Sequence, residues 1–275
     1  MADPEAEYEP VAEGLVQRSL RLCIEADRPE PGPGEVLVRV RAASVNFGET
    51  KLRTGVAKAA PLPFTLGSDL SGTVEAVGRG ATRFQPGDEV YGVQFIGTYA
   101  EYVAVQEGGL APKPDELDHV RAAALPVAGL TALAAVEEAD CGPGQRILIH
   151  AAAGGVGHIA VQLAKEKGAF VLATARAGKH EFLHELGADE IIDYTTTDFT
   201  QAARAVNVVF DLVGGAYGPR SLDSLRPGGL LLSAVLDPGL DENEAEKRGM
   251  RYKWVSLRPT RAELEKINTR WASVL

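Results

Sequence analysis

The sequence predicts an α/β protein in which an all-β, turn-rich half precedes a doubly wound parallel sheet. Three observations carry this expectation. From about residue 30 to 110, short strand-like runs are separated by closely spaced glycines, as in a small barrel. After Pro126, strands alternate with helix-length segments, which is typical of a parallel sheet that is buried on both faces. A glycine-rich turn then joins the first of these strands to an apolar-striped helix.

The first half begins where the run PEPGPG at residues 29–34 interrupts regular structure. Every second residue from Val36 to Ala42 is apolar, which predicts a half-buried strand. We expect further strands at residues 72–77, 88–93 and 98–105.

The second half contains short apolar runs separated by helix-length segments. We expect its strands at residues 146–150, 170–174, 190–193, 206–213, 229–234 and 252–257. The run TRAE at 260–263 is a capping box, and the helix that it begins places apolar residues at helical spacing. These residues are Leu264, Ile267, Trp271 and Val274.

Composition excludes several classes of protein. The 275 residues carry 28 basic and 38 acidic side chains, a net charge of −10, which disfavours bulk electrostatic binding of nucleic acid. The two cysteines, Cys23 and Cys141, form no CxxC, so they predict neither a disulfide framework nor a cysteine zinc lobe. Neither a signal peptide nor a membrane-spanning apolar run is visible. We therefore expect a cytoplasmic protein without nucleic-acid or membrane partners.

The most specific motif is the turn at residues 151–157, AAAGGVG. Gly154, Gly155 and Gly157 follow an apolar strand and lead into a helix, which is the context of a dinucleotide-binding turn. Ala152 stands where the GxGxxG pattern has its first glycine. We expect nucleotide binding here; the alternative is a tight turn between buried elements.

Several stretches in fixed order carry a family resemblance. They are residues 29–40, ASVN at 43–46, LGSDLSG at 66–72, PGDEV at 86–90, ALPVAGLTA at 124–132 and the glycine turn. Over residues 29–258 the chain resembles the zinc-free medium-chain dehydrogenase/reductases, in particular the quinone oxidoreductase (zeta-crystallin-like) and enoyl reductase group. The resemblance implies a GroES-like barrel domain at 1–123 and a Rossmann domain at 124–258 with NADPH between them. A C-terminal helix would occupy 259–275, without the family's usual return to the barrel.

The same resemblance assigns most of the expected site. Asn46 would lie beside the nicotinamide and the substrate carbonyl, and Thr131 on the nicotinamide-ribose side. The pyrophosphate would lie on Gly154, Gly155 and Val156. The nicotinamide wall would be formed by Leu212, Val213, Gly214, Ala234 and Val235.

Selectivity for NADPH is expected at the end of the second strand of the parallel sheet. An NAD-selective domain has a carboxylate there, about 20 residues past the glycine turn, but this chain has Arg176, 176 − 154 = 22 residues past Gly154. Its guanidinium and the ammonium of Lys179 suit a 2′-phosphate. The resemblance adds Tyr194 to this phosphate site, and Thr174 joins the cofactor-binding set. The alternative is an exposed basic turn.

No metal site is expected. Ser68 stands where zinc-binding relatives have a histidine, and the zinc-ligand cysteines are absent. The run HEFLH at 180–184 spells HExxH, but a helix would place Phe182, Leu183 and Leu186 on its buried face and the histidines His180 and His184 on the solvent side. We therefore do not expect a metalloprotease.

Without zinc, hydride transfer needs an electron-poor acceptor. A quinone or an α,β-unsaturated carbonyl fits, because hydride addition gives a delocalised anion. Lys51, where many relatives have tyrosine, is a second catalytic candidate that would stabilise the enolate; the alternative is a solvated lysine. The other functional class is a non-catalytic NADPH-binding partner or regulator.

The last expected strand, at residues 252–257, predicts a homodimer that forms through its unpaired edge, unless Lys253 blocks this pairing.

Overall fold

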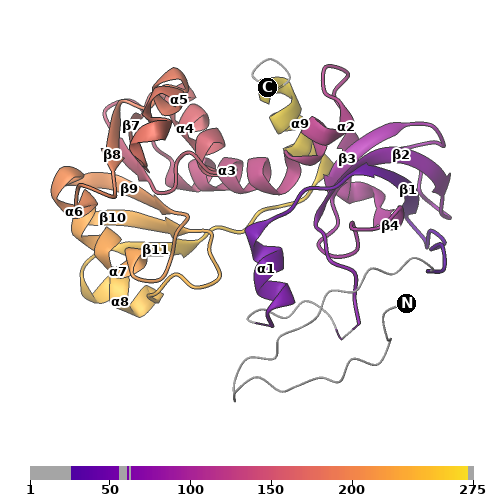
Figure 1. The fold of residues 1–275 in the computed structure, drawn as a ribbon, viewed down its shortest axis with the longest axis horizontal. Coiled ribbons are helices and arrows are strands. Elements are labelled where there is room, and N and C mark those ends of the chain that lie inside the picture. Colours follow the sequence, from indigo (N-terminus) through magenta and orange to yellow (C-terminus); the bar gives the residue numbers. More distant parts are fainter. Residues whose placement is uncertain (1–25, 56–60, 62, 272–275) are drawn as a thin grey trace, which may run out of the picture.

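A computed structural model of the chain describes residues 26–55, 61 and 63–271. It contains two sheets, one in each half of the chain, with α3 running between them (Figure 1). Residues 1–25 of the expected first domain, and Val274 of the expected terminal helix, lie outside the described residues.

The first sheet has the strand order β4-β1-β2-β3-β5, and every pairing in it is antiparallel. Its strands are β1 (Glu35–Ala42), β2 (Asp69–Val77), β3 (Glu89–Val93), β4 (Tyr102–Gln106) and β5 (Leu110–Pro112). The alternation predicted for β1 buries Val36 and Val38 against Leu70, Val90 and Val105. The strand expected from residue 98 begins only at Tyr102, because the backbone N–H groups of Thr98 and Tyr99 donate to the loop carbonyls of Gly67 and Leu66.

The second sheet has the strand order β11-β10-β9-β6-β7-β8, and all of its strands are parallel. Its strands are β6 (Arg146–Ile149), β7 (Phe170–Ala175), β8 (Glu190–Asp193), β9 (Val206–Asp211), β10 (Leu225–Ser233) and β11 (Arg251–Trp254). This is the order of a Rossmann sheet, in which successive connections reverse direction between β6 and β9. Ligands bind beyond the carboxyl ends of strands at such a point.

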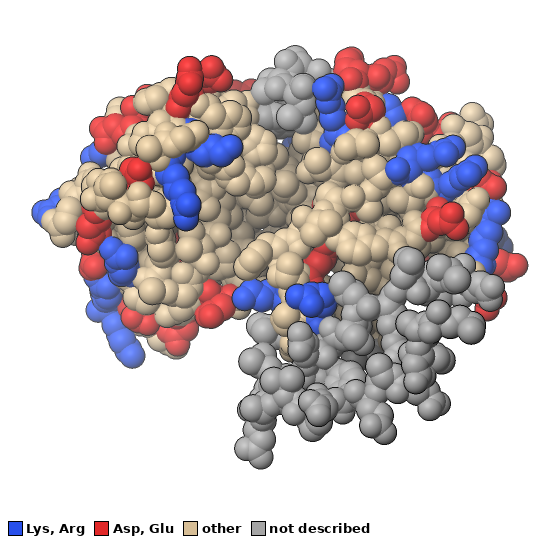
Figure 2. All heavy atoms as spheres, viewed as in Figure 1, with Lys and Arg blue, Asp and Glu red and all other residues tan. Residues whose placement is uncertain are grey.

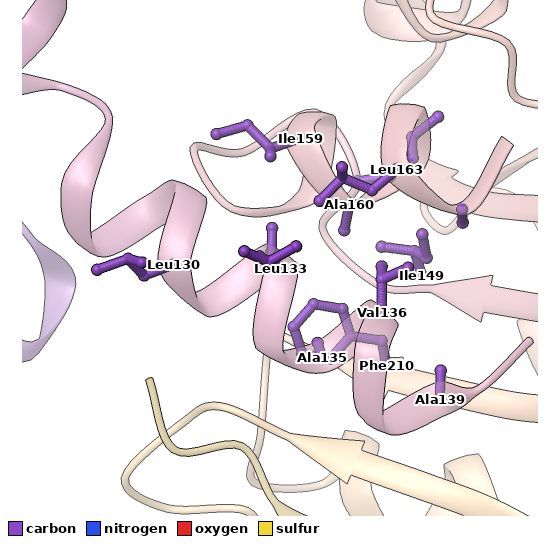
Figure 3. Close-up of a cluster of buried hydrophobic side chains, with 14 of the residues drawn as sticks. Leu130, Leu133, Ala135, Val136, Ala139, Ile149, Ile159, Ala160, Leu163 and Phe210 are labelled. Carbon is purple, nitrogen blue, oxygen red and sulfur yellow. The ribbon is translucent and has the colours of Figure 1, made fainter. Parts of the chain in front are cut away.

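Helices cover both faces of the parallel sheet. They are α3 (Pro126–Ala139), α4 (Gly157–Glu166), α5 (His180–Glu185), α6 (Phe199–Ala202), α7 (Tyr217–Ser221) and α8 (Glu242–Lys247). On one face, α3 and α4 pack Leu133, Val136 and Leu163 over Ile149 and Phe210 (Figure 3). On the other face, Phe199, Leu222 and Ala245 pack over Leu148, Leu172 and Leu231.

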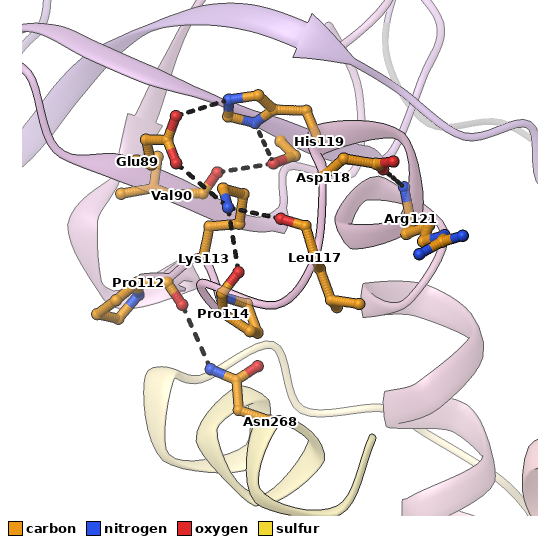
Figure 4. Close-up of polar contacts among 11 residues, drawn as sticks. Glu89, Val90, Pro112, Lys113, Pro114, Leu117, Asp118, His119, Arg121 and Asn268 are labelled. Carbon is orange, nitrogen blue, oxygen red and sulfur yellow. Dashed lines mark hydrogen bonds and ion pairs between the residues drawn. The ribbon is translucent and has the colours of Figure 1, made fainter. Parts of the chain in front are cut away.

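One of the apolar clusters contains residues of both halves, and the final helix, α9 (Arg261–Trp271), also joins them. Its Leu264 and Ile267 are buried as expected, and Glu263 N–H donates to the capping Thr260 hydroxyl at 3.3 Å. Tyr91 on β3 donates to the Leu264 carbonyl at 2.9 Å. Asn268 donates to the carbonyl of Pro112 at 3.3 Å, so α9 is held against β5 (Figure 4). Two further short helices, α1 (Phe47–Arg53) and α2 (His119–Ala123), belong to the first half.

Within the part of the chain that the structure describes, no helix combines the length and the apolar character that crossing a membrane requires.

Candidate cofactor and active site

The glycine turn lies at the carboxyl end of β6, at the switch point of the parallel sheet. Gly154 and Gly155 are exposed, and a Cβ atom at Gly155 would meet nothing within 4 Å. Gly157 is buried at the start of α4, where a Cβ atom would lie 2.5 Å from the carbonyl oxygen of Ala151. The turn therefore leaves open backbone at 154–155 and requires glycine at 157. This arrangement fits a bound pyrophosphate, since the first turn of α4 directs N–H groups at the same space.

A buried hydrogen-bonded chain supports this turn from beneath. Thr174 Oγ1 accepts the N–H of Ala151 at 3.2 Å and donates to His150 Nδ1 at 3.2 Å. The other ring nitrogen of His150 lies 3.1 Å from the hydroxyl of Ser221. Burial, with a contribution from Arg220, lowers the pKa of His150 to about 3, so the ring is neutral. Thr174 is only 1% exposed, so its contact to the turn is through Ala151.

The expected 2′-phosphate residues lie together on one exposed corner. Arg176 follows β7, and its Nε donates to the hydroxyl of Tyr194 at 3.0 Å. Lys179 lies on the same short turn and is exposed. Asp193 at the end of β8 accepts the N–H of Ala177 at 3.1 Å, which fixes the turn. The structure thus brings together the three side chains that the sequence assigned to this site.

The expected nicotinamide wall consists of the loops that follow β9 and β10. Asp211 Oδ1 accepts the N–H groups of Val213 at 2.9 Å and Gly214 at 3.0 Å, which ends β9 two residues earlier than predicted. Gly214 has a φ of +75°, and a Cβ atom there would lie 2.2 Å from the carbonyl oxygen of Asp237 in the β10 loop. Val213 is exposed, while Leu212, Ala234 and Val235 are half-buried. The two loops are therefore in contact.

Asn46 is the N-cap residue of α1, which lies between the two halves (Figure 1). Figure 2 shows the surface hollowed between these halves on the face in view. The Asn46 side-chain nitrogen donates to Asp69 Oδ2 at 2.8 Å, and its backbone N–H donates to Glu49 Oε2 at 2.8 Å. Asp69 is 1% exposed, and burial raises its pKa to about 6.

The remaining expected site residues lie on α3 and α1. Thr131 is buried on α3 and donates to the carbonyl of Val127 at 2.7 Å. Lys51 is half-buried on α1, and its Nζ lies 5.3 Å from the centre of the Phe47 ring. Phe47 is itself 72% exposed.

Sequence reasoning missed three polar neighbours of Asn46: Glu49, Asp69 and Tyr99. Glu49 is buried and accepts from the Tyr99 hydroxyl. The spacing Asn46-x-x-Glu49 is a capping-box pattern, and it would have revealed Glu49. Asp69 stands inside the LGSDLSG stretch and carried no signal beyond its acidity.

The described residues contain no group of three or more His, Cys, Asp or Glu side chains that could hold a metal ion. Ser68 instead donates to the carbonyl of Phe95 at 3.2 Å. In the HExxH run, Leu183 is buried and His184 is exposed, as expected. Two expectations for this helix are wrong: Phe182 is 39% exposed and lies beside the His158 ring, and His180 is half-buried with its Nε2 shielded from solvent. That the protein holds no zinc stays a prediction.

A second constellation has the outline of a hydrolase triad. His119 Nδ1 lies 2.8 Å from the hydroxyl of Ser71, and its Nε2 lies 3.2 Å from Glu89 (Figure 4). Ser71 is fully buried, however, and its hydroxyl also lies 3.1 Å from the carbonyl of Val90. A buried hydroxyl cannot reach an acyl carbon, so this group binds α2 to β2 and β3.

Comparisons with known proteins agree with the division of the chain into two domains, one for each sheet. Residues 32–115 match the alcohol dehydrogenase GroES-like domain, and residues 155–250 match the family described as zinc-binding dehydrogenase. The chain is 36% identical to the solved quinone oxidoreductase of Coxiella burnetii, with a TM-score of 0.85, covering 90% of this chain and 81% of that one. For the Escherichia coli quinone oxidoreductase complexed with NADPH, the identity is 30% and the TM-score 0.84, covering 91% and 83%.

Curated relatives are longer. The quinone oxidoreductase of Pseudomonas aeruginosa is 40% identical over 213 residues, which are 74% of this chain and 66% of that protein. The NADPH-dependent alkenal/one oxidoreductase of Arabidopsis thaliana is 37% identical over 227 residues, covering 77% and 58%. The chain thus spans roughly three fifths of the length of these two relatives.

The chain belongs to the medium-chain dehydrogenase/reductases, in their quinone oxidoreductase and enoyl reductase group. The predicted fold class, a GroES-like domain followed by a Rossmann sheet, is confirmed.

Proposed function

We propose that this protein is an NADPH-dependent reductase that transfers hydride to a quinone or an α,β-unsaturated carbonyl. The observation that carries the proposal is the open glycine turn at the β6–β9 switch point, in a chain whose relatives are named quinone oxidoreductase and alkenal/one oxidoreductase. Nothing in the structure or among these relatives favours the alternative of a non-catalytic NADPH-binding regulator.

In this proposal the cofactor's adenine half is held by the turn and by the basic corner. The N–H groups at Gly154, Gly155 and Val156 would bind the pyrophosphate. Arg176, already directed by the Tyr194 hydroxyl, would pair with the 2′-phosphate, and Lys179 would add a point charge. The residue that follows β7 is Arg176 and not a carboxylate, and the Asp193 carboxylate at this corner already accepts the N–H of Ala177.

The nicotinamide half would lie between the β9 and β10 loops and the Asn46 side of the first half. Bound NADPH supplies the hydride. Leu212, Val213, Gly214, Ala234 and Val235 would form one wall, and Asn46 and Thr131 would contact the nicotinamide end. The substrate that accepts the hydride must be electron-poor, because no metal polarises its carbonyl group in this scheme. Lys51 would stabilise the negative charge that develops on the substrate.

Steady-state NADPH oxidation with a panel of small quinones and enones tests the proposal. We expect turnover with members of the panel and saturable NADPH binding by fluorescence. NADPH binding without turnover on any acceptor would favour the non-catalytic alternative, and absence of binding would refute both.

We further propose that the protein forms a homodimer through β11. This strand is the edge of the parallel sheet, and its Trp254 is 45% exposed. Lys253, the residue expected to block pairing, forms an ion pair with Glu138 instead of standing free. Sedimentation equilibrium should show a dimer at micromolar concentration that Trp254→Glu dissociates. Val120→Glu places the same charge at an exposed apolar site on α2 and should leave the dimer intact. A wild-type monomer would contradict the proposal.

The expected domain boundaries and the expected cellular location also remain proposals. We propose the domain boundaries 1–123, 124–258 and 259–275, which limited proteolysis would test. A cytoplasmic location stays a prediction that fractionation would test.

A further inference from the structure

The hydrogen-bond donors around Asn46 are already committed to acceptors inside the protein. Ser44 and Asn46 both donate to Asp69, and Tyr99 donates to Glu49. Thr131 donates to the Val127 carbonyl and Ser68 to that of Phe95. These side chains therefore offer a ligand acceptor atoms rather than donors.

The orientation of the Asn46 amide follows from the charges behind it. Its nitrogen lies 2.8 Å from Asp69 Oδ2 and 3.4 Å from Glu49 Oε1. Rotating the amide by 180° would place its oxygen against two carboxylates, which would take one donor from each of them and repel the oxygen. The nitrogen is thus fixed inward. The oxygen Oδ1 then points away from both carboxylates and can accept a hydrogen bond from a ligand.

Asp69 also reaches the helix that carries Thr131. Its Oδ1 accepts the N–H of Val127 at 2.8 Å, in the first turn of α3, while Oδ2 accepts from Asn46. A negative charge is favoured at the N-terminus of a 14-residue helix. One buried carboxylate therefore ties the Asn46 segment of the first half to the helix that enters the second half.

We propose that Asp69 is the positioning residue of the site: by holding the Asn46 amide nitrogen and the start of α3 together, it presents Asn46 Oδ1 as an acceptor for a donor group on the nicotinamide half of the cofactor. The inference rests on the proposed function. It means that Asn46 binds cofactor and does not donate to the oxyanion that develops on the substrate. The complementary group is a carboxamide N–H or a ribose hydroxyl, since both are donors.

Cofactor binding without an acceptor substrate tests this assignment. Asn46→Ala should raise the Kd for NADPH about 5- to 30-fold, the range expected for a lost hydrogen bond. Asp69→Asn should raise it similarly. Because Asp69 acts through Asn46, the double variant should bind no more weakly than Asn46→Ala alone, whereas independent effects would multiply. The matched control is Asp88→Asn, which changes a half-buried carboxylate that accepts the Gln85 N–H and should leave Kd unchanged.

A shorter ligand distinguishes effects on the binding of the adenine half from effects on the binding of the nicotinamide half. The affinity for 2′,5′-ADP, which lacks the nicotinamide half, should be unchanged in Asn46→Ala and Asp69→Asn and should fall in Arg176→Ala. If the adenine half responds to Asp69→Asn, the role of Asp69 is general folding, and the inference is wrong. If wild-type protein binds neither ligand, the proposed function itself fails.

The pH dependence provides a readout that a packing role would not give. Protonated Asp69 cannot accept from Ser44, Asn46 and Val127 together, so NADPH binding by the wild type should weaken as the pH falls through about 6, the pKa of Asp69. The titratable groups that face it are Glu49 on α1 and Tyr99 in the β3–β4 loop. The 2′-phosphate also titrates near pH 6, but equally in Asp69→Asn, so the difference between the two proteins isolates Asp69.

A milder variant protects the test against misfolding of Asp69→Asn. Ser44→Ala removes one hydrogen bond that lowers the pKa of Asp69, so the acid limb should move to higher pH. Coincident wild-type and Ser44→Ala profiles, together with additive effects in the double variant, would overturn the positioning role.

Discussion

Gly157 lies so close to Ala151 that a Cβ atom at position 157 would be 2.5 Å from the Ala151 carbonyl oxygen and 2.7 Å from the Ala152 Cα. Gly155, two residues earlier, has no atom within 4 Å of the same hypothetical Cβ. The two glycines of this motif are therefore needed for different reasons. Gly157 is needed for the helix to pack on the turn, and Gly155 leaves space for a ligand.

Alanine at these positions should separate stability from binding. Gly157→Ala forces backbone apart and should destabilise the ligand-free protein by about 1–3 kcal/mol, seen as a lower thermal midpoint. Gly155→Ala should leave that midpoint unchanged and raise the Kd for NADPH. Equal midpoint losses in the two variants would show that both glycines are structural.

The basic corner should decide between NADPH and NADH. Wild type should bind NADPH at least about tenfold more tightly, a gap of about 1.4 kcal/mol or more. Arg176→Ala should lose most of this gap while it keeps its NADH affinity, because only the 2′-phosphate contact is removed. Tyr194→Phe is the milder variant, since it removes the hydroxyl that directs the guanidinium. Equal wild-type affinities for the two cofactors would contradict the assignment.

The part of this site that was predictable is the part built by neighbours in sequence. The turn at 154–157 and the Arg176 position follow from the spacing of one βαβ unit, and the structure places Arg176 beside Tyr194. Contacts made across the fold carry no such spacing. Asp69 and Val127 are 58 residues apart, and only folding brings the carboxylate to the start of α3.

Strand ends were predicted less well than strands, for a local reason. The run 206–213 is apolar to its end, but Asp211 Oδ1 binds two following N–H groups and turns the chain away from the sheet. Similarly, Ala151 has a φ of +48°, a conformation that nothing in an alanine run announces. Side chains that bind their own backbone decide these ends, and an apolar pattern does not record them.

Lys51 should affect turnover more than stability. Its ammonium lies over the Phe47 ring and forms no ion pair with any residue that the structure describes. If it meets a developing oxyanion, Lys51→Ala should lower kcat by about 10- to 1000-fold. Arg53→Ala, on the same helix, is the control for charge alone and should leave kcat near the wild-type value. Unchanged kcat and KM in Lys51→Ala would identify the residue as a solvated lysine.

The buried His150 should make the fold sensitive to acid. Its pKa is about 3 in the folded protein, below the ordinary value of 6.5, because burial disfavours the charged ring. The unfolded chain therefore takes up a proton between these values and the folded protein does not. The stability is fully present above pH 6.5 and is lost as the pH falls, by up to about 1.4 kcal/mol per unit.

His150→Phe isolates this effect because the ring contacts to Phe199 and Tyr217 can be retained. The variant should be less stable at pH 7.5, since Thr174 loses its acceptor, but its stability should fall less steeply between pH 6.5 and 4. Asp69 acts in the opposite direction over part of this range: its pKa is raised from 3.8 to about 6, so its contribution to stability falls as the pH rises between those values. Asp69 is present in both proteins, so the difference between their unfolding free energies at each pH reports His150 alone. Parallel curves would mean that His150 does not titrate on unfolding.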